Sequence, residues 1–265
     1  MAGGNHIFKS MKVSKEADKR FVQKHLDMGL DKTEAAYASM VEGMDKSLGD
    51  LMTFVKEKGL ADNTTILFMS DNGGLSAHAR GGEPHTHNRP LASGKGSAYE
   101  GGIREPMIVK WPGTVEPSSI CDQYVIIEDF FTSVLQMADI KNQATVQYID
   151  GERFVPLLKG KEAARDTTRS LIWHYPNRWG GHGPGIGTTS TIRKGDWKLI
   201  YWYKDQSKEL YNIKKDIGEY HDLSEQYPQK VDELSKALGK YLRSVDAQRP
   251  SFKNSGELVP WPDEI

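Results

Sequence analysis

The sequence predicts an α/β fold that is followed by a small antiparallel α+β subdomain. A long amphipathic helix over residues 31–58 precedes a short apolar run at residues 65–69, and this order is half of an α/β unit. Several short strand-like runs then follow one another between residues 170 and 213, and a last amphipathic helix covers residues 228–245. Consecutive strands closed by one helix are typical of an antiparallel α+β subdomain.

The first helix has recognisable ends and one apolar face. Asp31 is a plausible N-cap, Glu34 completes a capping-box pattern, and Gly59 suits the position just past the helix. Its apolar residues recur at steps of three and four, which predicts that this face packs into a core. They are Ala36, Tyr37, Met40, Val41, Met44, Leu48, Leu51, Met52 and Val55.

The apolar run Thr65–Met69 is rich in residues that favour strands, and it predicts a strand buried on both faces. It ends at Ser70-Asp71-Asn72-Gly73-Gly74, where polar residues would stand at the carboxyl end of a sheet. A long loop with many Gly, His and Pro residues follows. We expect a further strand at 106–111 and a helix at 128–138.

The pattern changes after about residue 165, and it predicts two domains, residues 1–160 and 161–265. In the second domain we expect strands at 170–175, 189–193, 197–203 and 209–213, with a hairpin turn at Lys194-Gly195-Asp196. Pro228 suits the first turn of the terminal helix. The tail from residue 249 contains three prolines and is expected on the surface.

Composition excludes several classes of protein. Lys and Arg number 35 against 36 Asp and Glu, for a net charge of −1, which argues against nucleic acid as a partner. No apolar run approaches the roughly 18 residues of a membrane span, so no membrane partner is expected. The only cysteine is Cys121, so neither an intrachain disulfide nor a cysteine-based zinc site can form. No signal peptide is visible.

Asp71 and Asn72 are candidate metal ligands. A carboxylate and an amide stand side by side at the end of a strand, and both offer the hard oxygen atoms that Ca²⁺ or Mg²⁺ prefers. Taken alone, the stretch Asp-Asn-Gly-Gly is also what a simple Asx turn requires.

The segment Ser93-Gly-Lys-Gly-Ser-Ala-Tyr-Glu-Gly-Gly-Ile-Arg-Glu-Pro106 is dense in glycine, and Lys95 stands between two of the glycines. A lysine flanked by glycines can bring a compact ammonium close to an anion. The alternative is a solvated surface lysine, which is the usual place of this residue type.

Together, in this order, the two motifs resemble the second half of the catalytic domain of type I, formylglycine-dependent sulfatases, which belong to the alkaline-phosphatase-like superfamily. The resemblance continues through Trp111-Pro-Gly113, Ile192-Arg-Lys-Gly-Asp-Trp-Lys-Leu-Ile200 and Glu209-Leu-Tyr-Asn212, so it covers nearly the whole chain. It implies that the fold is the C-terminal part of an alkaline-phosphatase-like mixed-sheet sandwich, followed by the family's small C-terminal subdomain.

The resemblance also implies roles for individual residues. Asp71 and Asn72 would be two ligands of an active-site Ca²⁺, with Mg²⁺ the lesser alternative. Lys95 would contact the sulfate group and offset charge as the ester bond breaks. The segment Glu100-Gly101-Gly102 and Arg104 would build the loop rather than touch the substrate. A periplasmic, secreted or lysosomal parent protein, acting on a sulfated small molecule or glycan, would be usual for this family.

The family's nucleophile is a formylglycine made from the first residue of a Cys/Ser-x-Pro-Ser-Arg motif, and this sequence contains no such motif. The Asp-Asp pair that the family contributes to its metal site is also missing. We therefore expect a sulfatase fragment that needs the N-terminal half of the protein as its partner, and an isolated chain without turnover.

Three histidines are candidates for substrate binding. His85 and His87 lie in the long loop, and His174 begins the C-terminal subdomain. Two further functions stay open from the sequence. The complete protein could hydrolyse phosphate or phosphonate esters, as other members of the superfamily do, or this chain could bind sulfated glycans without catalysis.

Overall fold

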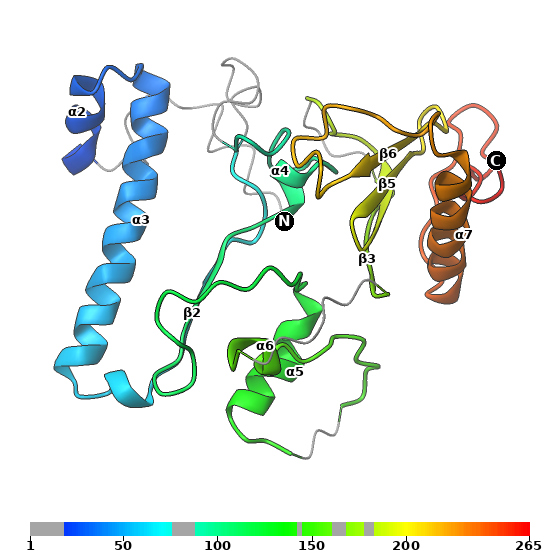
Figure 1. The fold of residues 1–265 in the computed structure, drawn as a ribbon. Coiled ribbons are helices and arrows are strands. Elements are labelled where there is room, and N and C mark those ends of the chain that lie inside the picture. Colours follow the sequence, from blue (N-terminus) through cyan, green and yellow to red (C-terminus); the bar gives the residue numbers. More distant parts are fainter. Residues whose placement is uncertain (1–18, 76–87, 142–144, 161–167, 178–182) are drawn as a thin grey trace. The chain divides into compact units, whose positions relative to one another are not determined.

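A computed structural model of the chain describes residues 19–75, 88–141, 145–160, 168–177 and 183–265 (Figure 1). The chain divides into two compact units, which are described separately below. One comprises residues 1–66 and 109–113, and the other comprises residues 67–108 and 114–265.

The first unit contains two packed helices, α2 (Lys19–Asp27) and α3 (Lys32–Glu57). The predicted cap of α3 is confirmed, because the Asp31 side chain accepts hydrogen bonds from the backbone N–H groups of Thr33 and Glu34. Gly59 follows the helix with a φ of 68°, which favours glycine. Helix α2 was not predicted; it is joined to α3 by Lys24 and His25, both of which pair with Glu42.

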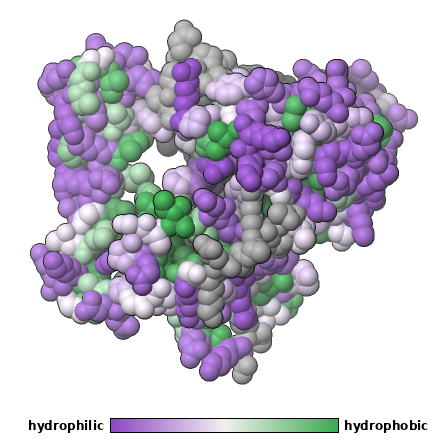
Figure 2. Space-filling view, viewed as in Figure 1, coloured by the Kyte–Doolittle hydropathy of each residue, from purple (hydrophilic) through white to green (hydrophobic). Residues whose placement is uncertain are grey.

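The expected core packing of the α3 stripe is wrong in this structure. Only Ala35, Ala36 and Ser39 of the helix are buried. Apolar side chains of the stripe and beside it are 39 to 52 % exposed: Val41, Met44, Leu51, Met52 and Phe54. Green hydrophobic patches are visible among the purple surface of this helix in Figure 2. The periodicity correctly identified an apolar face, but no described element covers it.

The N-cap of α3 supplies a first prediction. Replacing Asp31 with alanine should cost about 1 kcal/mol of stability, because two backbone N–H groups lose their acceptor. Urea unfolding followed by helical circular dichroism measures the change. Asp50→Ala is the control, since Asp50 makes an exposed pair with Lys46 on the same helix. An equal loss in the two variants would contradict the capping role.

Strand β1 (Ile66–Met69) pairs with β2 (Met107–Lys110) in a two-stranded sheet. The prediction that β1 is buried on both faces is wrong, because all four of its residues are only partly buried. The reason is that β2 is the only described strand beside it. A short 3-10 helix η1 (Ala61–Asn63) precedes β1. Helices α4 (Glu100–Ile103), α5 (Glu128–Met137) and α6 (Val155–Leu158) belong to the second unit.

A four-stranded antiparallel sheet in the order β3-β4-β5-β6 lies in the C-terminal region (Figure 1). Its strands are β3 (Ser170–Tyr175), β4 (Thr189–Lys194), β5 (Trp197–Trp202) and β6 (Lys208–Asn212). The predicted hairpin at residues 194–196 is confirmed by the pairing of Lys194 with Trp197. The predicted boundary between residues 160 and 161 stays a prediction, because residues 161–167 lie outside the described part of the chain.

Helix α7 (Pro228–Ser244) confirms the amphipathic helix predicted at residues 228–245, and one of its faces packs on this sheet (Figure 1). Leu234, Leu238 and Leu242 are at most 1 % exposed and join the core residues of the strands. The tail was expected on the surface, and this is wrong for Val259 and Trp261. Both are buried in the same core, which places their apolar side chains away from water.

Candidate functional site

Asp71 and Asn72 follow the end of β1 with only Ser70 between, as the sequence predicted. The backbone of the next residue, Gly73, donates a hydrogen bond to the carbonyl of Gly102 at 3.1 Å. A Cβ atom on Gly73 would overlap the carbonyl oxygen of Gly101. The end of the strand can therefore lie against α4 only because residue 73 is a glycine.

The loop that carries Lys95 is bound to the same strand end. The Lys95 backbone N–H donates to the carbonyl of Gly74 at 3.0 Å. The Asn88 amide donates to the carbonyls of Gly74 and Ser93, at 2.8 and 2.9 Å, and so links the residues after β1 to the loop. Cβ atoms on Gly101 and Gly102 would overlap backbone carbonyls of this loop. Glu100 is 1 % exposed, so the segment builds the loop, as expected.

The two motifs line one cavity of about 930 Å³ within the second unit. Asp71, Asn72, Lys95 and His174 are all among its lining residues. Four of the six candidate residues from the sequence are therefore brought to one place. The other two, His85 and His87, lie outside the described residues.

Glu105 also lines this cavity, and the sequence analysis did not select it. Its Oε1 atom is buried and has no hydrogen-bond partner among the described residues. Burial, and then the negative charge of Asp71, raise the pKa of Glu105 to about 7. In the sequence, Glu105 stands out only as part of the motif Arg104-Glu105-Pro106. That motif gave no indication that its carboxylate faces Asp71.

These oxygen atoms fit a hard divalent cation. Asp71 and Asn72 offer carboxylate and amide oxygens, and a nearby cation would also relieve the repulsion between Asp71 and Glu105. No group of three or more His, Cys, Asp or Glu residues suited to a metal occurs in the described part of the chain. Ca²⁺ takes 6–8 oxygen ligands. Asp71 and Asn72 alone could therefore supply only part of the ligands of such an ion.

His174 lines the cavity, but both of its ring nitrogens are engaged within the protein. Nε2 lies 2.6 Å from the carbonyl of Gln248, which can only accept, so Nε2 carries a proton. Burial lowers the pKa of His174, which favours the neutral ring, and Nδ1 then accepts from the Ser190 hydroxyl at 2.7 Å. The hydroxyl of Tyr203 completes the chain by donating to Ser190. This arrangement favours a structural role over substrate binding.

The His174 arrangement gives a prediction about pH. Because the folded-state pKa lies below the value near 6.5 of a free histidine, the neutral ring stabilises the fold above that pH. This contribution is lost as the pH falls through the folded-state pKa. Urea unfolding between pH 8 and pH 5 should show a smaller loss of stability in His174→Gln than in the unmodified chain. Parallel pH profiles for the two proteins would contradict the prediction.

The chain matches two family models. Residues 1–140 match the sulfatase model, and residues 94–248 match the model described as the C-terminal part of N-sulphoglucosamine sulphohydrolase. Among the described residues, no helix has the length and apolar character needed to cross a membrane.

Individual relatives agree with these matches. A sulfatase of Formosa agariphila is 32 % identical over 251 residues, which cover 87 % of this chain and 43 % of the relative. The human N-acetylgalactosamine-6-sulfatase is 32 % identical over 82 % of this chain and 45 % of its own length. The chain thus spans less than half the length of these relatives.

A solved structure of Ps i-CgsB in complex with a neocarrahexaose has a TM-score of 0.72 and 28 % identity. The match covers 89 % of this chain and 48 % of the chain in that structure. A phosphonate monoester hydrolase from Silicibacter pomeroyi, at 20 % identity and a TM-score of 0.60, shares the fold alone. From the family models and these relatives, we conclude that the chain belongs to the sulfatase family and has an alkaline-phosphatase-like fold.

Proposed function

We propose that this chain carries one half of a sulfatase active site, and that the complete protein hydrolyses sulfate esters of a sulfated glycan. One observation carries the proposal: Asp71, Asn72 and Lys95 come from separate motifs but line the same cavity. The hydrogen bond from Lys95 N to Gly74 O ties the two motifs together at 3.0 Å. An ammonium beside a cation site is an arrangement suited to an anionic group such as sulfate.

In this proposal Asp71 and Asn72 hold Ca²⁺, while Lys95 binds a sulfate oxygen and stabilises the charge that develops as the ester bond breaks. When bound, Ca²⁺ would neutralise charge on the sulfate oxygens. Mg²⁺ suits the site less well, because it demands a near-ideal octahedron. The nucleophile would be a formylglycine from the N-terminal half of the protein. Cys121 is exposed and followed by Asp-Gln-Tyr, so it does not begin the required motif.

The partner in this proposal is the N-terminal half of a sulfatase polypeptide. The relatives contain more than twice the length that this chain matches. The Asp71–Asn72 pair supplies two or three of the 6–8 ligands that Ca²⁺ takes. The apolar stripe of α3, and the edge of β1 that no described strand covers, are surfaces that an additional segment would bury. A periplasmic, secreted or lysosomal compartment is part of the same proposal.

A sulfated sugar is the substrate class that the comparisons favour. The solved structure at 28 % identity is a complex with a neocarrahexaose. The relative at 32 % identity is an N-acetylgalactosamine-6-sulfatase. The similarity to a phosphonate monoester hydrolase concerns the fold alone, so it does not favour the alternative of phosphonate or phosphate esters.

A chimaera tests the proposal. Residues 1–265 replace the corresponding half of the Formosa agariphila sulfatase, whose N-terminal half would supply the nucleophile in this proposal. We expect the chimaera to hydrolyse 4-nitrophenyl sulfate and a sulfated oligosaccharide, to lose activity in EDTA and to regain it with Ca²⁺. The isolated chain should show no turnover.

Each other outcome points to a different function. Turnover by the isolated chain would contradict the proposal that the site is incomplete. Preference of the chimaera for 4-nitrophenyl phosphate would favour a phosphate-ester hydrolase. Binding of the sulfated oligosaccharide without turnover, in both the chain and the chimaera, would favour a glycan-binding module.

A further inference from the structure

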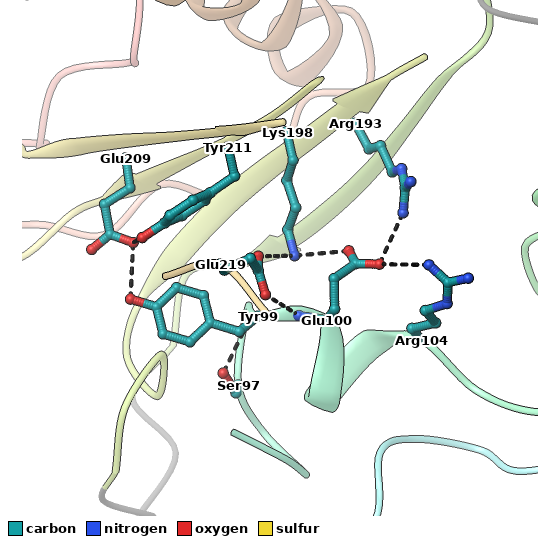
Figure 3. Close-up of polar contacts among 9 residues, drawn as sticks. All are labelled: Ser97, Tyr99, Glu100, Arg104, Arg193, Lys198, Glu209, Tyr211 and Glu219. Carbon is teal, nitrogen blue, oxygen red and sulfur yellow. Dashed lines mark hydrogen bonds and ion pairs between the residues drawn. The ribbon is translucent and has the colours of Figure 1, made fainter. Parts of the chain in front are cut away.

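Four charged side chains form a buried ion cluster at the start of α4: Glu100, Arg193, Lys198 and Glu219 (Figure 3). Their residues are 1, 4, 0 and 7 % exposed. Glu100 belongs to the glycine-rich motif, whereas the other three come from β4, β5 and the segment after β6. The cluster therefore joins the motif that carries Lys95 to the C-terminal sheet.

Glu100 is held through both its side chain and its backbone (Figure 3). Lys198 Nζ lies 3.1 Å from Glu100 Oε1 and 2.8 Å from Glu219 Oε1. Arg193 Nη1 donates to Glu100 Oε2 at 2.9 Å, and the backbone N–H of Glu100 donates to Glu219 Oε2 at 2.6 Å. The direction of both the Glu100 side chain and its peptide group is thus fixed by other segments.

The positive groups of this cluster favour the charged form of its two carboxylates, to different extents. Burial alone would raise the pKa of Glu100, but the ammonium of Lys198 and the guanidinium of Arg193 outweigh it and lower that pKa. Burial raises the pKa of Glu219, and Lys198 offsets only part of this change. Taking several charges out of water contributes little net stability compared with apolar packing. A cluster of this kind is better suited to fixing geometry.

The backbone between the cluster and Lys95 has little conformational freedom. The Tyr99 hydroxyl donates to Glu209 Oε2 on β6 at 2.9 Å (Figure 3), and the Tyr99 backbone N–H donates to Ser97 Oγ at 3.0 Å. Ala98 N donates to the Gly185 carbonyl at 2.9 Å. At the other end, Lys95 N is bound to Gly74. Lys95, Ala98, Tyr99 and Glu100 are therefore all tied to other parts of the second unit.

We propose that the buried ion cluster and the Tyr99–Glu209 hydrogen bond beside it form one positioning device: the cluster holds Glu100, the hydrogen bond holds Tyr99, and together they fix the backbone that presents Lys95 to the cavity. Lys198, Arg193 and Glu219 are positioning residues that do not contact the substrate themselves. The inference rests on the proposed role of Lys95 in sulfate-ester hydrolysis. It assigns to the C-terminal sheet, which supplies no candidate metal ligand or nucleophile, a part in arranging the active site.

Hydrogen exchange on the isolated chain tests whether the cluster fixes the backbone that carries Lys95. Lys198→Met should raise the exchange rates of amides 95–103 about tenfold or more, while the amides of β4 and β5 keep their protection. Lys194→Met, the same substitution at a partly exposed lysine of β4, should leave both segments unchanged. Faster exchange throughout the unit, or unchanged exchange at 95–103, would overturn the positioning role.

A double-mutant cycle in the chimaera tests the catalytic part with 4-nitrophenyl sulfate. Lys198→Met should lower kcat by about 10- to 100-fold, because displacement of a catalytic group by about 1 Å can cost that much. In a Lys95→Ala background the same substitution should change kcat less than about twofold, since the residue that it positions is gone. Equal losses in both backgrounds would mean that the cluster acts independently of Lys95.

A milder variant keeps the test valid if Lys198→Met does not fold. Tyr99→Phe removes the bond to Glu209, which still accepts from Tyr211, so no buried charge loses all its partners. It should give a smaller loss of kcat that also disappears in the Lys95→Ala background. A chimaera with no turnover would count against the proposed function, and the exchange experiment would still decide whether the cluster fixes the loop.

Discussion

Replacing Lys95 with alanine is expected to lower kcat of the active chimaera for 4-nitrophenyl sulfate by roughly 10²–10³-fold. This is the range found when one donor that stabilises developing negative charge is removed from an active site. Lys95 is held in place by its backbone bond to Gly74 and lines the cavity with Asp71 and Asn72. Its ammonium would therefore stabilise the transition state more than the bound substrate.

Two further variants separate charge from geometry. Lys95→Arg keeps the positive charge but replaces a compact ammonium with a planar, larger group, so it should recover only part of the activity. Lys110→Ala removes an exposed lysine at the end of β2 and should leave kcat unchanged. A loss confined to KM in Lys95→Ala would contradict the catalytic role, because it would mean that Lys95 binds substrate and transition state equally.

The features that the sequence predicted well are those set by neighbouring residues. The Asp31 cap and the turn at residues 194–196 depend on residues within one turn of each other. The three leucines of α7 follow from helical periodicity. Asp71, Asn72 and Lys95 could be brought together because their motifs resemble those of a known family, and the structure places them around one cavity.

The features that the sequence did not predict depend on distant residues. Lys198 is fully buried because Glu100 neutralises it from 98 positions away, and no local pattern marks this pairing. The exposure of the α3 stripe has a similar cause: periodicity shows that a face is apolar, but not which segment covers it. Glu105 became a candidate only when the fold brought its carboxylate beside Asp71.

Arg169→Met should lower the free energy of unfolding by about 3–5 kcal/mol, the usual cost of breaking a buried ion pair by removing one partner. Asp129 is 1 % exposed and lies at the start of α5. Its carboxylate accepts from both terminal nitrogens of Arg169, at 2.8 and 2.6 Å, and from the backbones of Ile126 and Glu152. Without Arg169, a buried negative charge would keep just two backbone donors among the described residues.

The loss of stability in Arg169→Met should come from the Asp129 carboxylate that is left without its partner. Two further variants test this. Adding Asp129→Asn to Arg169→Met should recover part of the lost stability, because the neutral amide can still accept from the backbone of Ile126 or Glu152. Arg243→Met breaks a more exposed pair, in which the Arg243 and Asp263 side chains are 43 and 14 % exposed, and should cost clearly less than Arg169→Met. Urea unfolding measures all four proteins. If Arg243→Met cost as much as Arg169→Met, or the double variant were less stable than Arg169→Met, the loss would reflect packing rather than an unpaired carboxylate.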